Sequence, residues 1–395
     1  MLKKINLNLI ITGLAVFSLL FGAGNLMYPI AVGLTSGKYN YIGLIGFLIT
    51  AVLLPLMGLV AMILYNGDYD AFFERLGKIP GKIMIAACVM ILGPGLVIPR
   101  IVAVAHLMIA QFLPFEFMQS LFIFSIMYLG ITFLGSFKEN KIVDVLGWVI
   151  SPLLLVSLAI VTIKGFLTAE SFVPTSLTPL KIFGTNMFRG YGTLDLIGTL
   201  FFASIIIKIL RDKFTTGSND QIGLKKLAMF GLKAGTIGVG LLAIVYWGLS
   251  FLGAYHGHGM ADLNAGVAFK QIVLNVMGYY GALILGMATL MACLSTSIGL
   301  GAVTADYMQK NIFKNKVGYV ASLTIVMLAC IPLSCYGLDA VFAITDGPLT
   351  FIGYPTLIAL VTCNILYKLF DFKYVKAPVA ATFIITCLAY FIFLV

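Results

Sequence analysis

Residues 7–29, LNLIITGLAVFSLLFGAGNLMYP, form an apolar run long enough to cross a lipid bilayer, but Gly22-Ala23-Gly24-Asn25 interrupts the run. A second run, residues 188–210, is interrupted in the same way by Gly190-Tyr191-Gly192-Thr193-Leu194-Asp195. Glycine weakens a helix and leaves backbone groups unpaired, and lipid offers those groups no partner. Such a break persists at membrane depth only where it faces protein or a wet cavity. A matched pair of broken helices therefore predicts the substrate site of a secondary transporter.

The composition places the whole chain in a membrane. Of its 395 residues, 61% are hydrophobic and 10% are charged, and the mean hydropathy is +1.07. A soluble domain carries roughly 25% charged residues. Runs of about 20 apolar residues, the length of a spanning helix, recur from one end of the chain to the other. We expect an all-α polytopic membrane protein with a single transmembrane domain over residues 1–395 and about 11 spans, near 7–34, 40–65, 83–111, 118–136, 142–166, 188–210, 224–253, 279–305, 316–335, 338–367 and 377–394.

The placement of positive charge predicts the orientation of the chain. Its net charge of +10 could suggest nucleic-acid binding. Most Lys and Arg residues, however, lie in or beside connections on the N-terminal side of the membrane, and the clear exceptions on the other side are Lys38, Lys164, Lys181, Arg189 and Lys270. Cytoplasmic connections carry such an excess of positive charge. We therefore expect a cytoplasmic N-terminus and no nucleic-acid partner.

The order of the spans predicts an inverted repeat. Residues of about 7–166 and of about 188–367 can be laid over one another as two five-helix halves, and each half opens with a broken helix. Because five is odd, the second half starts on the other side of the membrane, as in many sodium-coupled carriers. Residues 377–394 form a peripheral helix. Of the outer connections, residues 255–277 are either a short helix over an external vestibule or a surface loop.

Charged side chains inside the hydrocarbon region are costly and usually functional. Asp195 follows the second break, where it could hold a cation, accept a coupled proton or bind a substrate ammonium. It could equally be a structural partner of Arg100 or cap the second half-helix. Asp346, in an interruption at residues 345–348, could line the same cavity or cap the helix that follows. The half-helix after Asn25 points its positive end inward, which suits a carboxylate.

Three adjacent hydroxyls, those of Ser295, Thr296 and Ser297, lie within the eighth predicted span. Hydroxyls in membrane helices often bond back to their own helix. Next to the free carbonyls of a broken helix, however, they would complete a cage of hard oxygens suited to sodium. No group of His, Cys or paired carboxylates gathers at one depth, as an intramembrane enzyme would need, so no enzymatic activity and no cofactor other than a coupling ion are expected.

Five segments of the chain resemble those of the branched-chain amino acid carrier family, the BrnQ-type cation symporters of the amino acid–polyamine–cation superfamily. The segments that carry the resemblance are residues 21–26, 93–100, 190–195, 292–300 and 354–355. The resemblance implies a five-plus-five, LeuT-like fold with discontinuous first and sixth helices in a bacterial inner membrane. It also implies uptake of leucine, isoleucine and valine together with sodium or protons.

The resemblance further implies a set of site residues. Sodium would be held by carbonyls near Ser18 and Phe21, by the Ala292 carbonyl and by the Ser295 and Thr296 hydroxyls. The substrate backbone would lie among Ala23, Gly24, Asn25, Arg100, Tyr191, Gly192, Thr193 and Asp195. Asp346 stands where a small hydroxyl residue is more usual in the family, which leaves the cargo and the coupling open. The alternatives are methionine or another small amino acid as cargo, and an uncoupled facilitator, exchanger or channel as mechanism.

Overall fold

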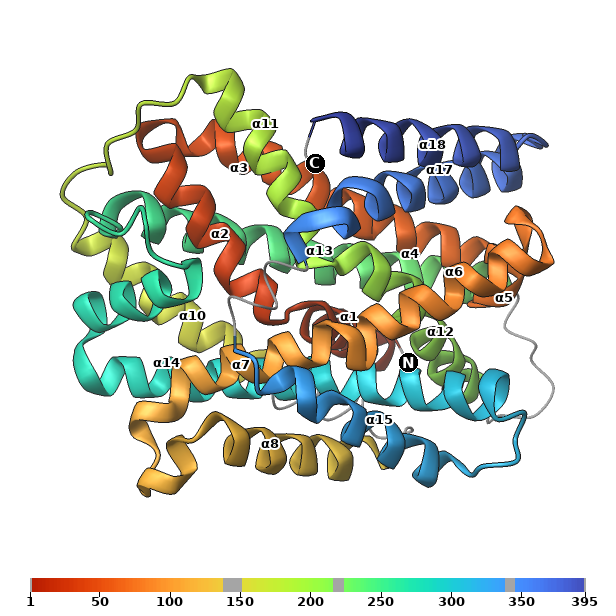
Figure 1. Cartoon of the computed structure of the whole chain (residues 1–395), viewed down its shortest axis with the longest axis horizontal. Coiled ribbons are helices and arrows are strands. Elements are labelled where there is room, and N and C mark those ends of the chain that lie inside the picture. The colour runs from red at the N-terminus through yellow and green to blue at the C-terminus, as the bar shows by residue number, and fades with distance from the viewer. Residues whose placement is uncertain (1, 138–150, 216–223, 338–344, 394–395) are drawn as a thin grey trace.

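The computed structural model describes residues 2–137, 151–215, 224–337 and 345–393, and every regular element in these ranges is a helix. Figure 1 shows long helices that run mostly along the longest axis of the molecule. The described α-helices of eight residues or more are α1 (Leu2–Leu20), α2 (Ala23–Ser36), α3 (Asn40–Leu48), α4 (Leu54–Leu64), α6 (Lys78–Met90), α7 (Val97–Ile109), α8 (Leu121–Ser136), α10 (Ser151–Leu167), α11 (Pro179–Arg189), α12 (Asp195–Thr215), α13 (Leu224–His256), α14 (Ala265–Tyr307), α15 (Tyr319–Ser334), α17 (Tyr354–Phe370) and α18 (Lys376–Phe393).

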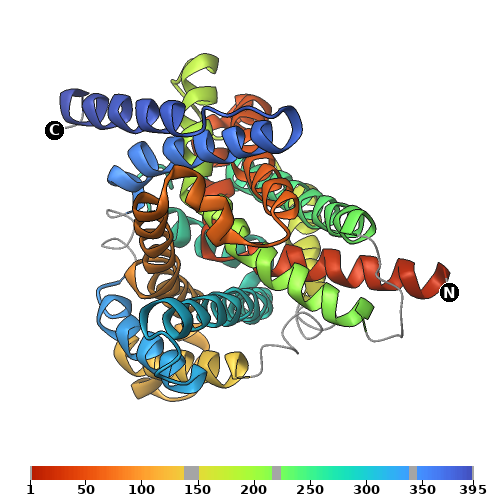
Figure 2. The same cartoon turned by 90° about the vertical axis from the view of Figure 1, so that its right-hand side faces the viewer.

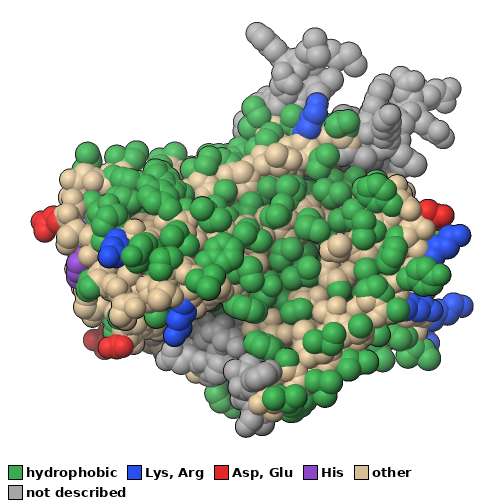
Figure 3. All heavy atoms as spheres, turned by 90° about the horizontal axis from the view of Figure 1, so that it is seen from above, with side chains coloured by type: hydrophobic (Ala, Val, Ile, Leu, Met, Phe, Trp, Pro, Cys, Tyr) green, Lys and Arg blue, Asp and Glu red, His purple; other side chains and the backbone are tan. Residues whose placement is uncertain are grey.

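The surface of the molecule is that of a multi-pass membrane protein. Helical stretches at Ala23–Leu64, Lys78–Phe112, Met229–His256, Ala265–Ile312 and Leu349–Phe370 are long and apolar enough to cross a bilayer, and shorter apolar helices accompany them. Hydrophobic side chains cover the middle of the face in Figure 3, and several Lys and Arg side chains gather at its right-hand edge. In Figure 2 the dark-blue α18 lies outside α17 at the periphery. The number of spans stays a prediction, and the spans expected at 142 and 338 begin outside the described residues.

The first break lies where the sequence predicts it. Helix α1 ends at Leu20, Phe21 and Gly22 are not helical, and α2 begins at Ala23. Gly22 is extended, with φ −108° and ψ −163°. Figure 1 shows the two half-helices meeting near the middle of the molecule. Residues 21–24 are buried, so the break faces the interior of the protein and not lipid, the condition under which a membrane tolerates it.

The second break is also confirmed, but the half-helix before it starts earlier than residue 188. Helix α11 begins at Pro179, with Thr178 as its N-cap (Thr178 Oγ1 accepts from Lys181 N at 3.4 Å). A short 3₁₀ turn, η9 (Gly190–Thr193), and a left-handed Leu194 (φ +63°) then separate α11 from α12. The polar residues of α11 hide this helix from a search for apolar runs. It is held by packing on α3, where Gly43 and Gly46 let its backbone approach closely.

Two further distortions lie in the third and tenth predicted spans. In η4 (Ile91–Gly95), Gly93 has the non-helical angles φ −90° and ψ −119°, so the third span divides into α6 and α7. In η11 (Thr345–Gly353), Gly347 is similarly non-helical, which confirms the interruption expected at residues 345–348. The side chain of Asp346 lies outside the described residues.

The outer segment that precedes the eighth predicted span is helical from Ala265, where α14 begins. Helix α14 extends back to Ala265 and bends at Gly278. Gly278 has φ +71°, a backbone conformation that glycine adopts with little steric strain. Phe269, Ile272 and Val273 on its first part are buried. Of the two possibilities for residues 255–277, the short helix is therefore the correct one from Ala265 onward.

Helices α2 and α13 approach each other at two glycines. A Cβ atom on Gly33 would overlap the Ser250 carbonyl and the Ala254 amide, and one on Gly253 would overlap the Ile30 carbonyl. Small residues at such positions let membrane helices pack backbone against backbone, which is a main source of helix association in lipid. This contact fixes α2, and with it the first break, against the second half of the chain.

We predict that Gly33→Ala destabilises the protein by about 1–3 kcal/mol, because the added methyl group overpacks the α2–α13 contact. The measurement is the midpoint of thermal unfolding in detergent. Gly130→Ala on α8 is the matched control, because a Cβ built at Gly130 meets no atom of another described helix within 4 Å. Equal midpoints for the two variants would show that the close approach at Gly33 does not hold the fold.

Candidate functional site

The two breaks touch each other at the centre of the molecule. A Cβ on Gly24 would lie 3.1 Å from Arg100 Nη2 and 3.3 Å from the Thr193 Cα, and one on Gly192 would overlap the Tyr28 ring. Gly24 therefore lets the α1–α2 break and η9 meet backbone to backbone, and Gly192 leaves room for the Tyr28 ring against η9. The sequence indicates both breaks, but only the fold shows that they face one another.

Asp195 lies between the two breaks and is 5% exposed. Both of its carboxylate oxygens accept hydrogen bonds from Asn25 Nδ2 at 3.1 Å, and Oδ2 also accepts from the Tyr246 hydroxyl at 3.2 Å. The amide of Asn25 additionally donates to the Leu20 carbonyl at the end of α1. Asp195 thus ties the first break to α12 and α13.

Neither of the purely structural roles weighed for Asp195 is seen in the described residues. The side chain of Asp195 accepts no hydrogen bond from a backbone amide of α12 in these residues, and its own amide lies 3.5 Å from Thr193 Oγ1. No ion pair within 4 Å joins Asp195 to Arg100 among these residues. The carboxylate instead faces the first break.

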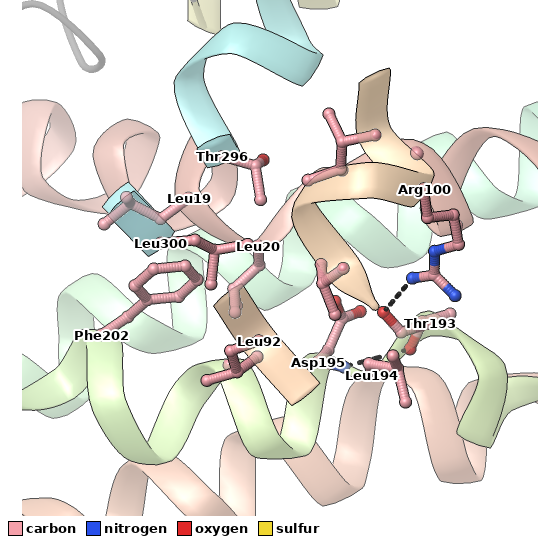
Figure 4. Close-up of a pocket in the computed structure, with 16 residues that line it drawn as sticks. Leu19, Leu20, Leu92, Arg100, Thr193, Leu194, Asp195, Phe202, Thr296 and Leu300 are labelled. Carbon is pink, nitrogen blue, oxygen red and sulfur yellow. Dashed lines mark hydrogen bonds between the residues drawn. The ribbon is translucent and has the colours of Figure 1, made fainter. Parts of the chain in front are cut away.

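Arg100, on α7 just after the η4 distortion, is 1% exposed and holds the second break in place. Its Nη1 donates to the Gly192 carbonyl at 2.7 Å, and its Nη2 donates to the Thr193 carbonyl at 3.4 Å. The second of these hydrogen bonds, from Arg100 to the Thr193 carbonyl, is drawn as a dashed line in Figure 4. A planar guanidinium can reach two neighbouring carbonyls at once, which a single ammonium does poorly. Arg100 therefore satisfies backbone oxygens that the interrupted helix leaves free.

A cluster of oxygen atoms lies beside the first break, on α14. Thr296 Oγ1 is within 3.3 Å of the Ser18, Phe21 and Ala292 carbonyls. Ser295 Oγ is 3.1 Å from the Ser18 carbonyl and 2.7 Å from the Ala292 carbonyl. All five residues expected to bind sodium therefore come together, and all are buried.

The chemistry of the oxygen cluster suits a hard cation. Three hydroxyls, those of Ser18, Ser295 and Thr296, bring one proton each, whereas every hydroxyl and carbonyl oxygen brings two lone pairs. Acceptor capacity thus exceeds donor capacity in a buried site. Uncharged oxygens of this kind are the ligands that hard cations prefer.

A cavity of about 20 Å³ lies between the breaks and helices α7, α12 and α14. Its wall combines polar groups of Thr193, Asp195 and Thr296 with apolar side chains that include Leu92, Phe202 and Leu300 (Figure 4). This volume holds about one water molecule and no amino-acid side chain of the size of leucine. The structure is therefore closed around the site.

The predicted substrate residues divide into two groups in the structure. Ala23, Gly24, Arg100, Thr193 and Asp195 line the cavity. Asn25, Tyr191 and Gly192 do not line it: Asn25 binds Asp195, Gly192 accepts from Arg100, and Tyr191 stacks on Tyr354 with ring centroids 5.0 Å apart. These three residues contact the groups around the cavity and do not face its interior.

Sequence reasoning did not find Tyr246, Leu92 or Phe202 as parts of this region. Each is one of many aromatic or aliphatic residues in an apolar helix, so nothing in the local sequence distinguishes it. The hydroxyl of Tyr246 becomes significant only because α13 carries it to Asp195.

A second cavity of about 260 Å³ lies on one side of the central site, at the end of the molecule where α2, α11 and the start of α14 meet. It is lined by Tyr28, Leu34, Arg189 and Asn264, among others. Arg189 donates to the Ala31 carbonyl at 2.9 Å and so joins α11 to α2. Tyr28, which packs on Gly192, is shared between this wall and the meeting point of the breaks.

Comparison with known proteins identifies the family. A family model described as branched-chain amino acid transport protein matches residues 5–393. The chain belongs to this family. A branched-chain amino acid permease, BrnQ, of Bacillus subtilis is 30% identical over 94% of this chain and 84% of its own length. BraB of the same organism is 29% identical (91% and 80%), and BrnQ of Escherichia coli K12 is 28% identical (90% and 80%). These relatives are named as permeases, which are transporters and not enzymes, as the sequence indicates.

Solved structures establish the fold class. A transporter of the nucleobase–cation symport family, in a closed conformation with bromovinylhydantoin bound, aligns with a TM-score of 0.56 at 13% identity, over 96% of this chain and 91% of its own. A Na⁺-coupled sialic acid symporter in an outward-open state also gives 0.56, at 11% identity, over 96% and 88%. The LeuT-like transporter fold predicted for this chain is thereby confirmed. The boundaries of the two repeats stay a prediction.

We predict that Arg100→Lys loosens the second break, because one ammonium cannot bind both the Gly192 and the Thr193 carbonyl. A hydrogen bond to a charged group contributes roughly 1.5–3 kcal/mol, so amide hydrogen exchange across residues 190–195 should accelerate about tenfold or more. Arg75→Lys, at the far edge of the molecule, is the control and should leave exchange in this segment unchanged. Unaltered exchange in Arg100→Lys would remove Arg100 from its supporting role.

Proposed function

We propose that this protein is a secondary active transporter that imports leucine, isoleucine, valine or similar apolar amino acids by cation symport. The observation that carries the proposal is the arrangement at the centre: two broken helices, one buried carboxylate and a cluster of uncharged oxygens surround one small, partly apolar cavity. Membership of the branched-chain amino acid transport family and the names of the related permeases support the same cargo.

The backbone of an amino acid fits the polar groups of the cavity. The first amides of α2, at Ala23 and Gly24, lie at a helix N-terminus, where backbone N–H groups lack intrahelical partners and the helix dipole favours negative charge. They suit the substrate carboxylate. The carboxylate of Asp195 suits the substrate ammonium. The guanidinium of Arg100 does not occupy this carboxylate, because it donates its hydrogen bonds to backbone carbonyls. Recognition of a zwitterion thus needs one acidic side chain.

The apolar part of the cavity wall favours an aliphatic side chain. Leu92, Ile101, Phe202 and Leu300 line it. Burial of a side chain such as leucine contributes about 1.5–3 kcal/mol, whereas a polar side chain would lose hydrogen bonds to water in the same place. One methylene group changes binding by only about 1–3 kcal/mol, so leucine, isoleucine, valine and methionine should compete with one another.

The oxygen cluster on α14 would hold the coupling ion, which we propose is sodium. The cluster contains hydroxyls and carbonyls and no carboxylate, so it has no group that takes up a proton near neutral pH. Two of its carbonyls, those of Ser18 and Phe21, come from the end of α1 next to the cavity. An ion there would fix the first break in the shape that binds the amino acid, so the two binding events would be coupled.

The energetics and the orientation are consistent with import. We place the protein in a bacterial inner membrane with its N-terminus in the cytoplasm, as the placement of Lys and Arg indicates. One positive charge that enters the cell down an inside-negative potential of about 100 mV releases about 2.3 kcal/mol. That energy alone supports roughly 50-fold accumulation. The closed cavity, with a larger cavity beyond Tyr28 on one side, corresponds to one stage of alternating access.

The direct test is uptake of radiolabelled leucine into proteoliposomes under an inward sodium gradient, a proton gradient or neither. We expect accumulation only with sodium, and competition by isoleucine, valine and methionine. Equilibration without either gradient would indicate a facilitator, and accumulation driven by protons alone would assign the coupling to another group.

Thr296→Ala should raise the sodium concentration needed for half-maximal uptake by about tenfold, since it removes one of the oxygen ligands. The matched control is Thr289→Ala on the same helix, whose buried hydroxyl lies outside the oxygen cluster. Sodium dependence should be unchanged in the control. An unchanged value in Thr296→Ala as well would remove this residue from the ion site.

Asp195→Asn should impair leucine uptake roughly tenfold to hundredfold, because a charge-assisted hydrogen bond contributes about 1.5–3 kcal/mol. The comparison is the same change at Asp306, which lies on α14 in an exposed ion pair with Lys310. Uptake rates are normalised to the amount of folded protein in the membrane. Wild-type uptake by Asp195→Asn would make Asp195 a purely structural residue.

A further inference from the structure

A cavity of about 420 Å³ lies far from the transport site, where the link between α17 and α18 meets η3 (Glu74–Leu76). Three cationic side chains line it: Arg75 from η3, and Lys373 and Lys376 from the link and the first turn of α18. Tyr367 and Tyr374 complete its wall. The proposed transport mechanism uses none of these residues.

The positive charge of this basic cavity is largely uncompensated. Lys373 has one acidic neighbour, Asp371, at 3.9 Å, and both side chains are exposed, so their attraction is weak. In the part of the chain that the structure describes, no carboxylate lies within 4 Å of Arg75 or Lys376. Glu74, next to Arg75 in sequence, is exposed. The cavity thus offers several N–H donors to an anion.

The basic cavity is a shaped site and not a set of mobile surface lysines. The guanidinium of Arg75 lies over the Tyr367 ring, 3.9 Å from its centroid. Helix α17 is closed by a left-handed Asp371, and Val375 in the link is only 3% exposed. The turn that carries both lysines is therefore anchored to the protein, so an anion would find their backbone positions already set.

The surroundings of the basic cavity are those of a membrane boundary. Beside it on α17, Leu369 and Phe370 are 56% and 74% exposed, and on α6, close to Lys376 through Gly77, Ile79 is 73% exposed. Figure 3 shows Lys and Arg side chains gathered at one edge of the hydrophobic surface. Exposed apolar side chains need lipid chains around them, whereas cations and tyrosines at such an edge lie at the depth of the headgroups.

We propose that the basic cavity binds the phosphate headgroup of an anionic phospholipid, with Arg75, Lys373 and Lys376 around the phosphate and the acyl chains over Leu369, Phe370 and Ile79. Basic pockets between membrane helices at the water boundary bind such headgroups, and each cation contributes about 1 kcal/mol near the surface. A soluble phosphate shares the headgroup chemistry but lacks the acyl chains. The neighbouring apolar surface therefore favours the lipid.

The test is a titration of phosphatidylglycerol into the purified protein in neutral detergent micelles, with the midpoint of thermal unfolding as the readout. Phosphatidylcholine, glycerol 3-phosphate and inorganic phosphate form the comparison arms. Lys373→Gln/Lys376→Gln is the first variant, because both lysines are exposed and their replacement leaves the packing intact. Lys314→Gln/Lys316→Gln, which removes two exposed lysines from the link between α14 and α15, is the matched control.

We expect phosphatidylglycerol to raise the midpoint and phosphatidylcholine not to do so. The first variant should need about 25-fold more phosphatidylglycerol for the same effect, about fivefold for each cation removed. Arg75→Gln should weaken the effect about fivefold, and the control variant should respond like the wild type. Equal stabilisation by the two lipids, or equal loss in the variant and the control, would overturn the site. Equal stabilisation by glycerol 3-phosphate or inorganic phosphate would assign it to a soluble anion.

Discussion

A backbone group inside a membrane must find a partner within the protein, and the centre of this molecule is arranged around that requirement. Each broken helix leaves carbonyl and amide groups unpaired, and side chains from other helices take them up. Arg100 from α7 binds the Gly192 and Thr193 carbonyls. Thr296 from α14 lies against the Ser18 and Phe21 carbonyls. The breaks are stable because the remaining helices are built to complete them.

In the proposed function, the same groups would bind the amino acid and the ion. Carbonyls that accept long hydrogen bonds from Thr296, at 3.2–3.3 Å, can turn to an ion at small cost. Amides at the start of α2 are available because Gly22 is extended and does not continue the helix. Structural completion and ligand binding thus compete for the same atoms. In the proposed transport cycle, the cavity of about 20 Å³ would have to open to admit an amino acid.

Sequence patterns predicted the helix breaks correctly where the signal lay in the segment itself. They failed where a helix depends on packing against another helix. Both central breaks and the interruption before α17 were predicted, since glycine in an apolar run is a local signal. The start of α11 was missed, because its polar residues look like a loop and only the glycines of α3 give it a surface to pack on. The division of the third span at Gly93 was also missed, although Gly93-Pro94-Gly95 was visible, because Pro is tolerated in many membrane helices.

The sequence by itself determined that this is a helical membrane protein with two interrupted helices, an acidic residue after the second and three hydroxyls on a later helix. Composition, run length and glycine placement suffice for these conclusions, since each follows from the chemistry of lipid and backbone. Only the tertiary structure decided that the breaks touch, that Asn25 and Tyr246 hold Asp195, and that Leu92 and Phe202 face the cavity. These contacts join residues far apart in the chain, and in a sequence that is 61% hydrophobic no local pattern distinguishes a lining side chain from one that faces lipid.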